Sequence, residues 1–304
     1  MLPHPFAIIP RILPTSTAFP RALSAANSCL RTAGIVSAAL FSSVCAQAQE
    51  PAVATLDPEL AINRAAADGL DWHDVEAWGV EGRILPDQAR ARWFDRLPQS
   101  AEASVTKNVW NLSRDSAGMM VRFTTDATAI HVHYKLRKAN LAMPHMPATG
   151  VSGVDLYARD TDGQWKWVQV ARPGSQEVKA ELIKGMAPGE REYAAYLPLY
   201  NGVEFLQIGV PQDSKFSGHA PRPNPIVFYG TSITHGACAS RPGMVHTGIL
   251  GRRFDSPIVN LGFSGNGRMD KAVGDYLLQI DASVYVIDCL PNMGPNDVAA
   301  KCVP

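Results

Sequence analysis

The chain has 304 residues, with 28 basic and 28 acidic side chains, and its formal net charge is zero. The basic residues are scattered along it, which argues against nucleic acid as a partner. Hydrophobic residues make up 46% of the chain, enough to bury substantial cores in one or two domains.

The first 48 residues have the pattern of a secretory signal peptide. Arg31 precedes an apolar stretch, residues 33–44, that is too short to cross a membrane. Ala46-Gln-Ala48 then forms a small-x-small cleavage pattern. We therefore expect cleavage after Ala48 and a secreted or periplasmic protein. Cys45 could mark a lipoprotein, but the residues before it make a poor lipobox, and no other segment is expected to span a membrane.

Residues 51–213 show many short segments with the spacing of β-strands. In residues 129–136 the apolar side chains Ile130, Val132, Tyr134 and Leu136 alternate and share one face. Further strands are expected at residues 119–124, 153–159, 165–170, 192–197 and 204–210. Turn dipeptides such as Asp162-Gly separate some of them. This pattern predicts an all-β accessory domain, a jelly-roll-like antiparallel sandwich.

Two features of this region allow a functional interpretation beside a structural one. His131-x-His133 places two imidazoles on one strand face, but without a third ligand nearby a solvated face is favoured over a metal site. The tryptophans, including Trp110, Trp165 and Trp167, could form a platform for sugars or ordinary core and interface. Both interpretations of the tryptophans stay open.

A proline-rich linker is expected at residues 214–225, and a second domain begins at Ile226. Residues 226–228 form a short apolar strand, Gly230 permits a sharp turn, and Ser232 follows at the start of a helix. A hydroxyl at the carboxyl end of a buried strand stands where open α/β sheets bind ligands. Taken alone, Ser232 is better explained as part of an ordinary helix start.

Two more strand ends strengthen the case for a site at Ser232. Residues 256–263 run into the turn Ser264-Gly-Asn-Gly267, and residues 282–289 run into Leu290-Pro-Asn292. Helix-length segments separate the three strands, so the sheet should be parallel, with its carboxyl ends on one edge. The main-chain N–H groups of Ser232 and Gly265 and the side-chain amide of Asn292 are suitable donors to an oxyanion.

These residues resemble a known family. The runs Y-G-T-S-I-T, N-L-G-F-S-G-N and L-P-N-M resemble the first three blocks of the GDSL/SGNH hydrolase superfamily, with Thr231 in place of its aspartate. The resemblance implies a flavodoxin-like α/β fold in which Ser232 is the nucleophile and Gly265 and Asn292 complete the oxyanion hole. Residues 153–157, G-V-D-L-Y, resemble the GxDLY β-sandwich domain that precedes some SGNH esterases.

The family's catalytic base is a histidine in a late Asp-x-x-His block, and nothing similar follows Asn292. We therefore expect residues 226–304 to be a partial, C-terminally truncated SGNH domain, and this chain to be inactive. His235 and His246 lie close in sequence to the serine. A base must reach the hydroxyl and be oriented by a carboxylate, so His235 is expected at the rim of the site and is not assigned as base.

Cys238, Cys289 and Cys302 remain after export, which permits disulfides. A bridge between Cys238 and Cys289 and two separate buried thiols are equally favoured. The cysteines and histidines have no spacing typical of zinc sites.

The expected function is a secreted serine esterase, plausibly a carbohydrate (acetyl) esterase, acting through an acyl-serine on a small-molecule or polysaccharide ester. No metal or organic cofactor is required. One alternative is a non-catalytic exported glycan-binding protein with a remnant hydrolase domain. Another is a lysophospholipase or thioesterase that uses the same serine.

Overall fold

Two antiparallel sheets dominate the first part of the structure, a computed structural model that describes residues 68–302. The predicted signal peptide lies outside these residues. The first sheet has the strand order β1-β8-β3-β6 and the second β5-β4-β7-β2-β9. Their bounds are β1 Leu70–Asp74, β2 Met120–Thr125, β3 Ile130–Leu136, β4 Asp155–Arg159, β5 Trp165–Val170, β6 Glu177–Ile183, β7 Arg191–Tyr196, β8 Val203–Pro211 and β9 Phe216–His219. The predicted antiparallel β-region is thereby confirmed.

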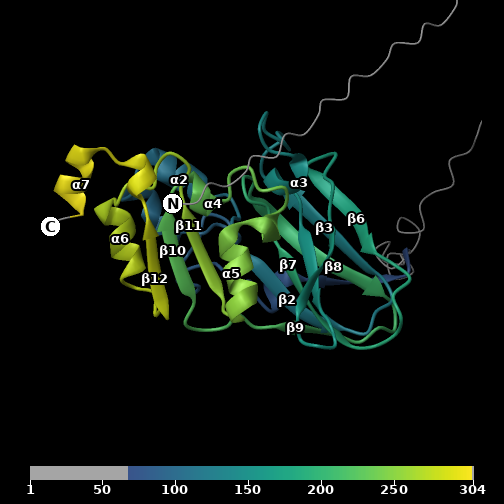
Figure 1. Ribbon diagram of the computed structural model, residues 1–304. Helices are drawn as coiled ribbons and strands as arrows, with labels where there is room; N and C mark the ends of the chain where they lie inside the picture. The colour runs from purple at the N-terminus through teal and green to yellow at the C-terminus, as the bar shows by residue number, and fades with distance from the viewer. Residues whose placement is uncertain (1–67, 303–304) are drawn as a thin grey trace, which may run out of the picture. The chain divides into compact units, whose positions relative to one another are not determined.

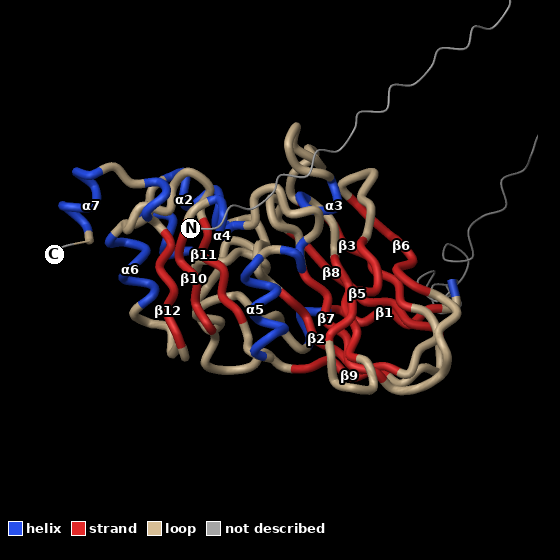
Figure 2. Tube along the Cα trace, viewed as in Figure 1, coloured by secondary structure: helices blue, strands red, loops and turns tan. Residues whose placement is uncertain are grey.

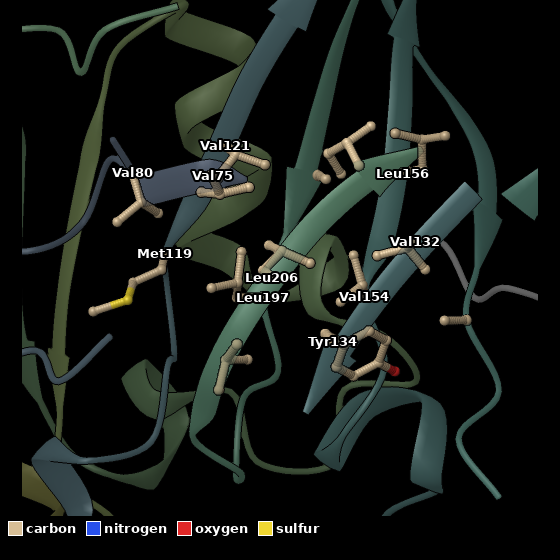
Figure 3. Close-up of a cluster of buried hydrophobic side chains, with 14 of the residues drawn as sticks. Val75, Val80, Met119, Val121, Val132, Tyr134, Val154, Leu156, Leu197 and Leu206 are labelled. Carbon is tan, nitrogen blue, oxygen red and sulfur yellow. The ribbon is translucent and has the colours of Figure 1, made fainter. Parts of the chain in front are cut away.

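The core of this region lies between the two sheets because apolar side chains alternate along the strands. Ile130, Val132, Tyr134 and Leu136 of β3 are all buried, as their spacing predicted. They share one cluster with residues of the opposite sheet such as Leu156. Figure 3 shows Val132 and Tyr134 among these side chains. Short helical turns connect the strands: η2 Val75–Ala77 and α3 Ala148–Val151.

Part of the segment predicted as a linker, residues 214–225, is a strand. β9 pairs antiparallel with β2, with Thr125 opposite Phe216. The ring of Phe216 stacks on Phe123 at 5.3 Å and on His73 at 3.8 Å between ring centroids. The prolines of the segment begin only at Pro221, after the strand has ended. This packing of an aromatic side chain against the sandwich explains why the strand forms.

The second part is a parallel sheet of three strands in the order β11-β10-β12. These strands, side by side in Figure 1, are β10 Ile226–Gly230, β11 Ile258–Gly262 and β12 Val284–Asp288. The intervening elements are α4 Ser232–His235, η4 Pro242–Met244, α5 His246–Phe254, α6 Lys271–Leu277, η5 Leu290–Asn292 and α7 Pro295–Lys301. Figure 2 shows α5 and α6 in blue beside the red strands. The predicted βαβαβ pattern is confirmed.

A segment from early in the chain covers one face of this parallel sheet. Ile84, Leu97, Val109 and Trp110 are buried in the same cluster as residues of β10, β11 and α6. The segment includes η3 Gln99–Ala103 and α2 Lys107–Ser113. Residues that sequence analysis grouped with the sandwich thus complete the core of the hydrolase region. Within residues 68–302, no helix combines the length and apolar character needed to cross a membrane.

Candidate active site

The three predicted site residues follow three neighbouring strand ends. Gly230, the last residue of β10, is level with Gly262 of β11 and with Asp288 of β12. Because the strands are parallel, their carboxyl ends meet at one edge of the sheet. Ser232 stands at the central strand, Gly265 after one neighbour and Asn292 after the other. The register therefore places Ser232 between the two further candidate donors.

Ser232 is raised at this edge by a tight turn between β10 and α4. A Cβ at Gly230 would lie 2.2 Å from the Thr234 hydroxyl, so only glycine allows the helix to pack this closely. Thr231 is the N-cap of α4, and its side chain accepts a hydrogen bond from the main chain of Ile233 at 3.3 Å. Ser232 is the first helical residue and is half-buried. Thr231 thus takes the capping role, which leaves the Ser232 hydroxyl free for chemistry.

The donors around Ser232 are free to bind an oxyanion. The side-chain nitrogen of Asn292 is buried and has no hydrogen-bond partner among the described residues. Within the same residues no acceptor faces the main-chain N–H of Ser232 or Gly265. Gly265 has a φ of +69°, in the left-handed region that favours glycine. A buried donor without a partner is costly in free energy, which suits a group that waits for a developing negative charge.

The structure corrects the expectation that His235 borders the substrate. Its side chain is fully buried, and its Nε2 lies 2.7 Å from the carbonyl oxygen of Leu199. Its ring stacks on Tyr200 with 4.1 Å between centroids. Burial, with the nearby charge of Arg96, lowers the pKa of His235 well below its ordinary value. His235 is a neutral core side chain, held between Leu199 and Tyr200.

No other histidine takes the role of base in the described residues. His246 at the start of α5 is half-buried against Phe228, and burial lowers its pKa. Among residues 68–302 no histidine is hydrogen-bonded to the Ser232 hydroxyl. In the whole sequence none of the eight histidines has an aspartate three positions before it. Residues 68–302 therefore hold a candidate nucleophile and candidate oxyanion donors, without a histidine hydrogen-bonded to the serine.

Arg96 is a buried arginine that holds the end of β11 by hydrogen bonds. Its guanidinium is fully buried and donates to the carbonyl oxygens of Asn260 at 2.8 Å and Gly262 at 3.0 Å, at the end of β11. It also donates to Leu112 at the end of α2, at 2.6 Å. Burial lowers the pKa of Arg96 to about 10. Arg96 thus ties the early segment to the strand that leads to Gly265. Nothing in the sequence sets Arg96 apart, because only its burial distinguishes it from other arginines.

The motif aspartate of the sandwich, Asp155, contacts the hydrolase region directly. Its carboxylate is fully buried and accepts hydrogen bonds from the Gly243 N–H at 2.8 Å and from the Trp167 indole at 2.9 Å. The guanidinium of Arg241 stands over the Trp167 ring, 4.5 Å from its centroid. Asp155 therefore fixes the loop that follows α4. Trp167 is half-exposed, but the arginine covers one face of it.

The other sequence candidates have structural roles. His133 is hydrogen-bonded to Glu177 at 2.9 Å on the outer face of β3. Within residues 68–302 no three histidine, cysteine or carboxylate side chains are placed to hold a metal ion. Trp110 is a core residue, only 5% exposed. Cys238, Cys289 and Cys302 are free thiols, and of these only Cys289 is buried.

Comparisons with known proteins agree with this geometry. A family model described as GxDLY, the N-terminus of SGNH-hydrolase-type esterases, matches residues 70–216. The model of the GDSL-like Lipase/Acylhydrolase family matches residues 223–304. A crystal structure of a protein classed as a GDSL-like lipase, from Bacteroides ovatus, is 32% identical with a TM-score of 0.71, over 77% of this chain and 68% of that one. The chain belongs to the GDSL-like lipase/acylhydrolase family.

Two further solved structures are less similar to this chain. The salicylyl-acyltransferase SsfX3 from a tetracycline biosynthetic pathway is 16% identical with a TM-score of 0.58, over 77% of this chain and 67% of that one. It shares the fold. A family two carbohydrate esterase from Clostridium thermocellum, in complex with cellohexaose, is 18% identical over 49% of this chain and 46% of that one. Its TM-score is 0.36. Among curated proteins, no match was found.

Membership of this family classes the chain as a hydrolase of ester bonds. The predicted resemblance to GDSL/SGNH hydrolases with a GxDLY domain is confirmed.

Proposed function

We propose that Ser232 is the nucleophile of a serine esterase that cleaves carboxylic esters through an acyl-serine. The observation that supports this most is the buried, unpartnered amide of Asn292, at the strand end next to that of Ser232. A donor left unpaired in a folded protein needs a reason, and binding an oxyanion supplies one.

In the proposed reaction the Ser232 oxygen bonds to the ester carbonyl carbon, whose oxygen becomes an oxyanion. The N–H groups of Ser232 and Gly265 and the Asn292 amide donate to it. The bond to the alcohol then breaks, the alcohol leaves with a proton, and an acyl-serine remains. Water attacks the acyl-serine, which releases the acid and restores the serine hydroxyl.

The proton of Ser232 requires an acceptor, and the described histidines do not provide one. We infer that residues 68–302 alone accelerate the reaction only by the oxyanion hole. In serine hydrolases that lack a triad member, such residual acceleration is about 10³–10⁴-fold over water. The family resemblance gives the role of base to a histidine of an Asp-x-x-His block.

We propose that the substrate is a short acyl ester of a carbohydrate, such as an acetyl ester. The protein would encounter it after export. Three points support it: the expected signal peptide with cleavage after Ala48, the accessory β-sandwich, and the balanced charge of the chain. A balanced charge gives no electrostatic preference for polyanions.

The test is hydrolysis of 4-nitrophenyl acetate by the full chain. We expect a slow rate above the buffer background that is lost in Ser232→Ala. Ser240→Ala is the matched control, because Ser240 is an exposed serine in the loop after the same helix. Equal rates for the wild type and Ser232→Ala would exclude Ser232 as nucleophile.

Asn292→Ala tests the oxyanion hole in the same assay. Losing one donor costs about 10²–10³-fold in kcat in a related kind of site, so we expect at least a tenfold lower rate. Asn296→Ala, an exposed asparagine on α7, is its control. An unchanged rate would remove Asn292 from the proposed mechanism.

Comparing esters separates the proposed function from its alternatives. Faster turnover of a decanoyl ester than of an acetyl ester would favour a lysophospholipase or thioesterase. Binding of oligosaccharides without any Ser232-dependent turnover would favour a glycan-binding protein.

A further inference from the structure

A pocket of about 690 Å³ opens beside the loop that bears Gly265. Ser264 and Asn266, the two neighbours of Gly265, line it. Its opposite wall comes from α2 and from the segment after β3, far away in sequence. The volume is in the range of small-molecule sites. A ligand in this pocket would thus lie one residue from an oxyanion donor.

The wall of the pocket presents three unpaired amides. Asn108 and Asn111 lie three residues apart on α2 and therefore share one face, and Asn140 follows β3. All three side chains are exposed, and within the described residues none of them is hydrogen-bonded to protein. An amide both donates and accepts hydrogen bonds. Sugar hydroxyls do the same, so the two kinds of group match.

Tyr200 lines the pocket, and its hydroxyl is buried behind the lining. Tyr200 is only 8% exposed, and its hydroxyl makes no hydrogen bond of acceptable geometry in the described residues, although Ser264 is its neighbour. Its ring is held by stacking on His235. The hydroxyl has no accessible surface, so Tyr200 contributes its fixed ring to the pocket wall.

The charges in the pocket are paired, which favours an uncharged ligand. Lys138 is the one cation in the lining, and its Nζ lies 2.6 Å from the buried carboxylate of Asp115. The same Nζ donates to the carbonyl oxygen of Tyr200 at 2.9 Å. An anionic ligand would have to compete with Asp115 for this ammonium group.

Apolar surface completes the lining. Met143, Pro144 and Val151 face the pocket together with the amides. A pyranose ring has apolar C–H faces and a hydroxyl rim, and both find partners here. A fatty acyl chain would instead remove the asparagine amides from water without replacing their hydrogen bonds, which costs free energy.

We propose that this pocket binds the alcohol part of the ester, and that this alcohol is an uncharged, hydroxyl-rich group of sugar type. The inference rests on the proposed function for the placement of the reacting ester. It assigns specificity to residues of α2 and of the segment after β3, beside the loop that bears Gly265.

The test measures binding apart from turnover. Xylobiose, which has no ester, is titrated into the full chain bearing Ser232→Ala, with ligand-detected NMR and calorimetry as readouts. We expect saturable binding that weakens about tenfold or more in Asn108→Ala/Asn111→Ala, since a tenfold change corresponds to about 1.4 kcal/mol, the order of one or two hydrogen bonds.

Asn296→Ala is the matched control, because Asn296 is exposed on α7 and does not line the pocket. Unfolding curves of each variant separate loss of binding from loss of fold. Absence of saturable xylobiose binding, unchanged binding in the asparagine variants, or tighter binding of decanoate or glucuronate would each overturn the proposal.

The outcomes also separate this proposal from the proposed function. Asparagine-dependent sugar binding without Ser232-dependent turnover would support the pocket and contradict the esterase. Ser232-dependent hydrolysis of 4-nitrophenyl acetate without sugar binding would support the esterase and contradict the pocket.

Discussion

The carboxylate of Asp155 in the β-sandwich accepts a hydrogen bond from the main-chain N–H of Gly243, 2.8 Å away in the hydrolase region. Gly243 has no room for a side chain, since a Cβ there would lie 2.4 Å from the Tyr157 ring. Two residues of the G-V-D-L-Y motif thus contact one loop, the one that follows the nucleophile helix. The motif acts as a clamp between the two regions.

The clamp predicts faster hydrogen exchange in Asp155→Ala. The substitution leaves the Gly243 N–H without an acceptor, so we expect the Gly243 amide to exchange about tenfold faster or more, the equivalent of about 1.4 kcal/mol of lost protection. Mass spectrometry of peptides that span residues 241–245 measures it. Asp162→Ala, at an exposed turn between β4 and β5, should leave these peptides unchanged. Unaltered exchange in Asp155→Ala would show that the loop is held by other contacts.

The clamp also predicts a pH dependence of stability. Burial raises the pKa of Asp155 to about 6, whereas an aspartate in an unfolded chain has a pKa of about 3.9. The folded state therefore binds this proton more tightly. Its contribution to stability is full below about pH 4 and is lost as the pH rises through about 6.

We expect the wild type to lose about 2–3 kcal/mol in free energy of unfolding relative to Asp155→Asn between pH 4 and pH 7, at about 1.4 kcal/mol per pKa unit. Urea denaturation of both proteins across this range measures the difference. A constant difference would mean that Asp155 does not titrate there.

Arg96→Met should strongly destabilise the fold. It leaves three carbonyl oxygens, of Asn260, Gly262 and Leu112, without their donor. Breaking a buried charged network in this way typically costs about 3–5 kcal/mol. Urea denaturation gives the free energy of unfolding. Arg253→Met, which changes an exposed arginine on α5, is the control and should cost less than about 0.5 kcal/mol. Similar losses in both variants would contradict the role assigned to Arg96.

The exposed side of β12 predicts self-association at high concentration. Val284, Tyr285 and Ile287 are 49%, 45% and 45% exposed, and in the described residues β12 pairs only with β10. Unpaired edges with apolar side chains bind other chains. Ile287→Lys should shift sedimentation towards the monomer, whereas Ile249→Lys on α5, where Ile249 is 41% exposed, should not. A monomer at all concentrations of the wild type would contradict this prediction.

Local patterns were sufficient to predict the strands and the place of Ser232. The alternation of apolar and polar residues along β3 and the apolar runs of β10 to β12 indicate which side chains are buried. Turn residues indicate where the strands end. The parallel order follows from strand and helix alternation, so the meeting of Ser232, Gly265 and Asn292 at one edge could be expected. The strands β1, β6 and β9 were missed. β1 and β9 have few apolar side chains, whereas β6 carries the alternating Val178, Ala180 and Leu182 and was predictable from its spacing.

The sequence by itself thus determined the family, the place of the candidate nucleophile and the two kinds of sheet, because these depend on spacing between near neighbours. Only the tertiary structure decided that His235 is buried, that Arg96 and residues 84–112 complete the hydrolase core, and that Asp155 clamps Gly243. It also formed the pocket beside Gly265, whose walls come from segments more than 100 residues apart in the sequence. Such contacts depend on which apolar faces pack together at long range, and the spacing of residues along the chain does not encode that choice.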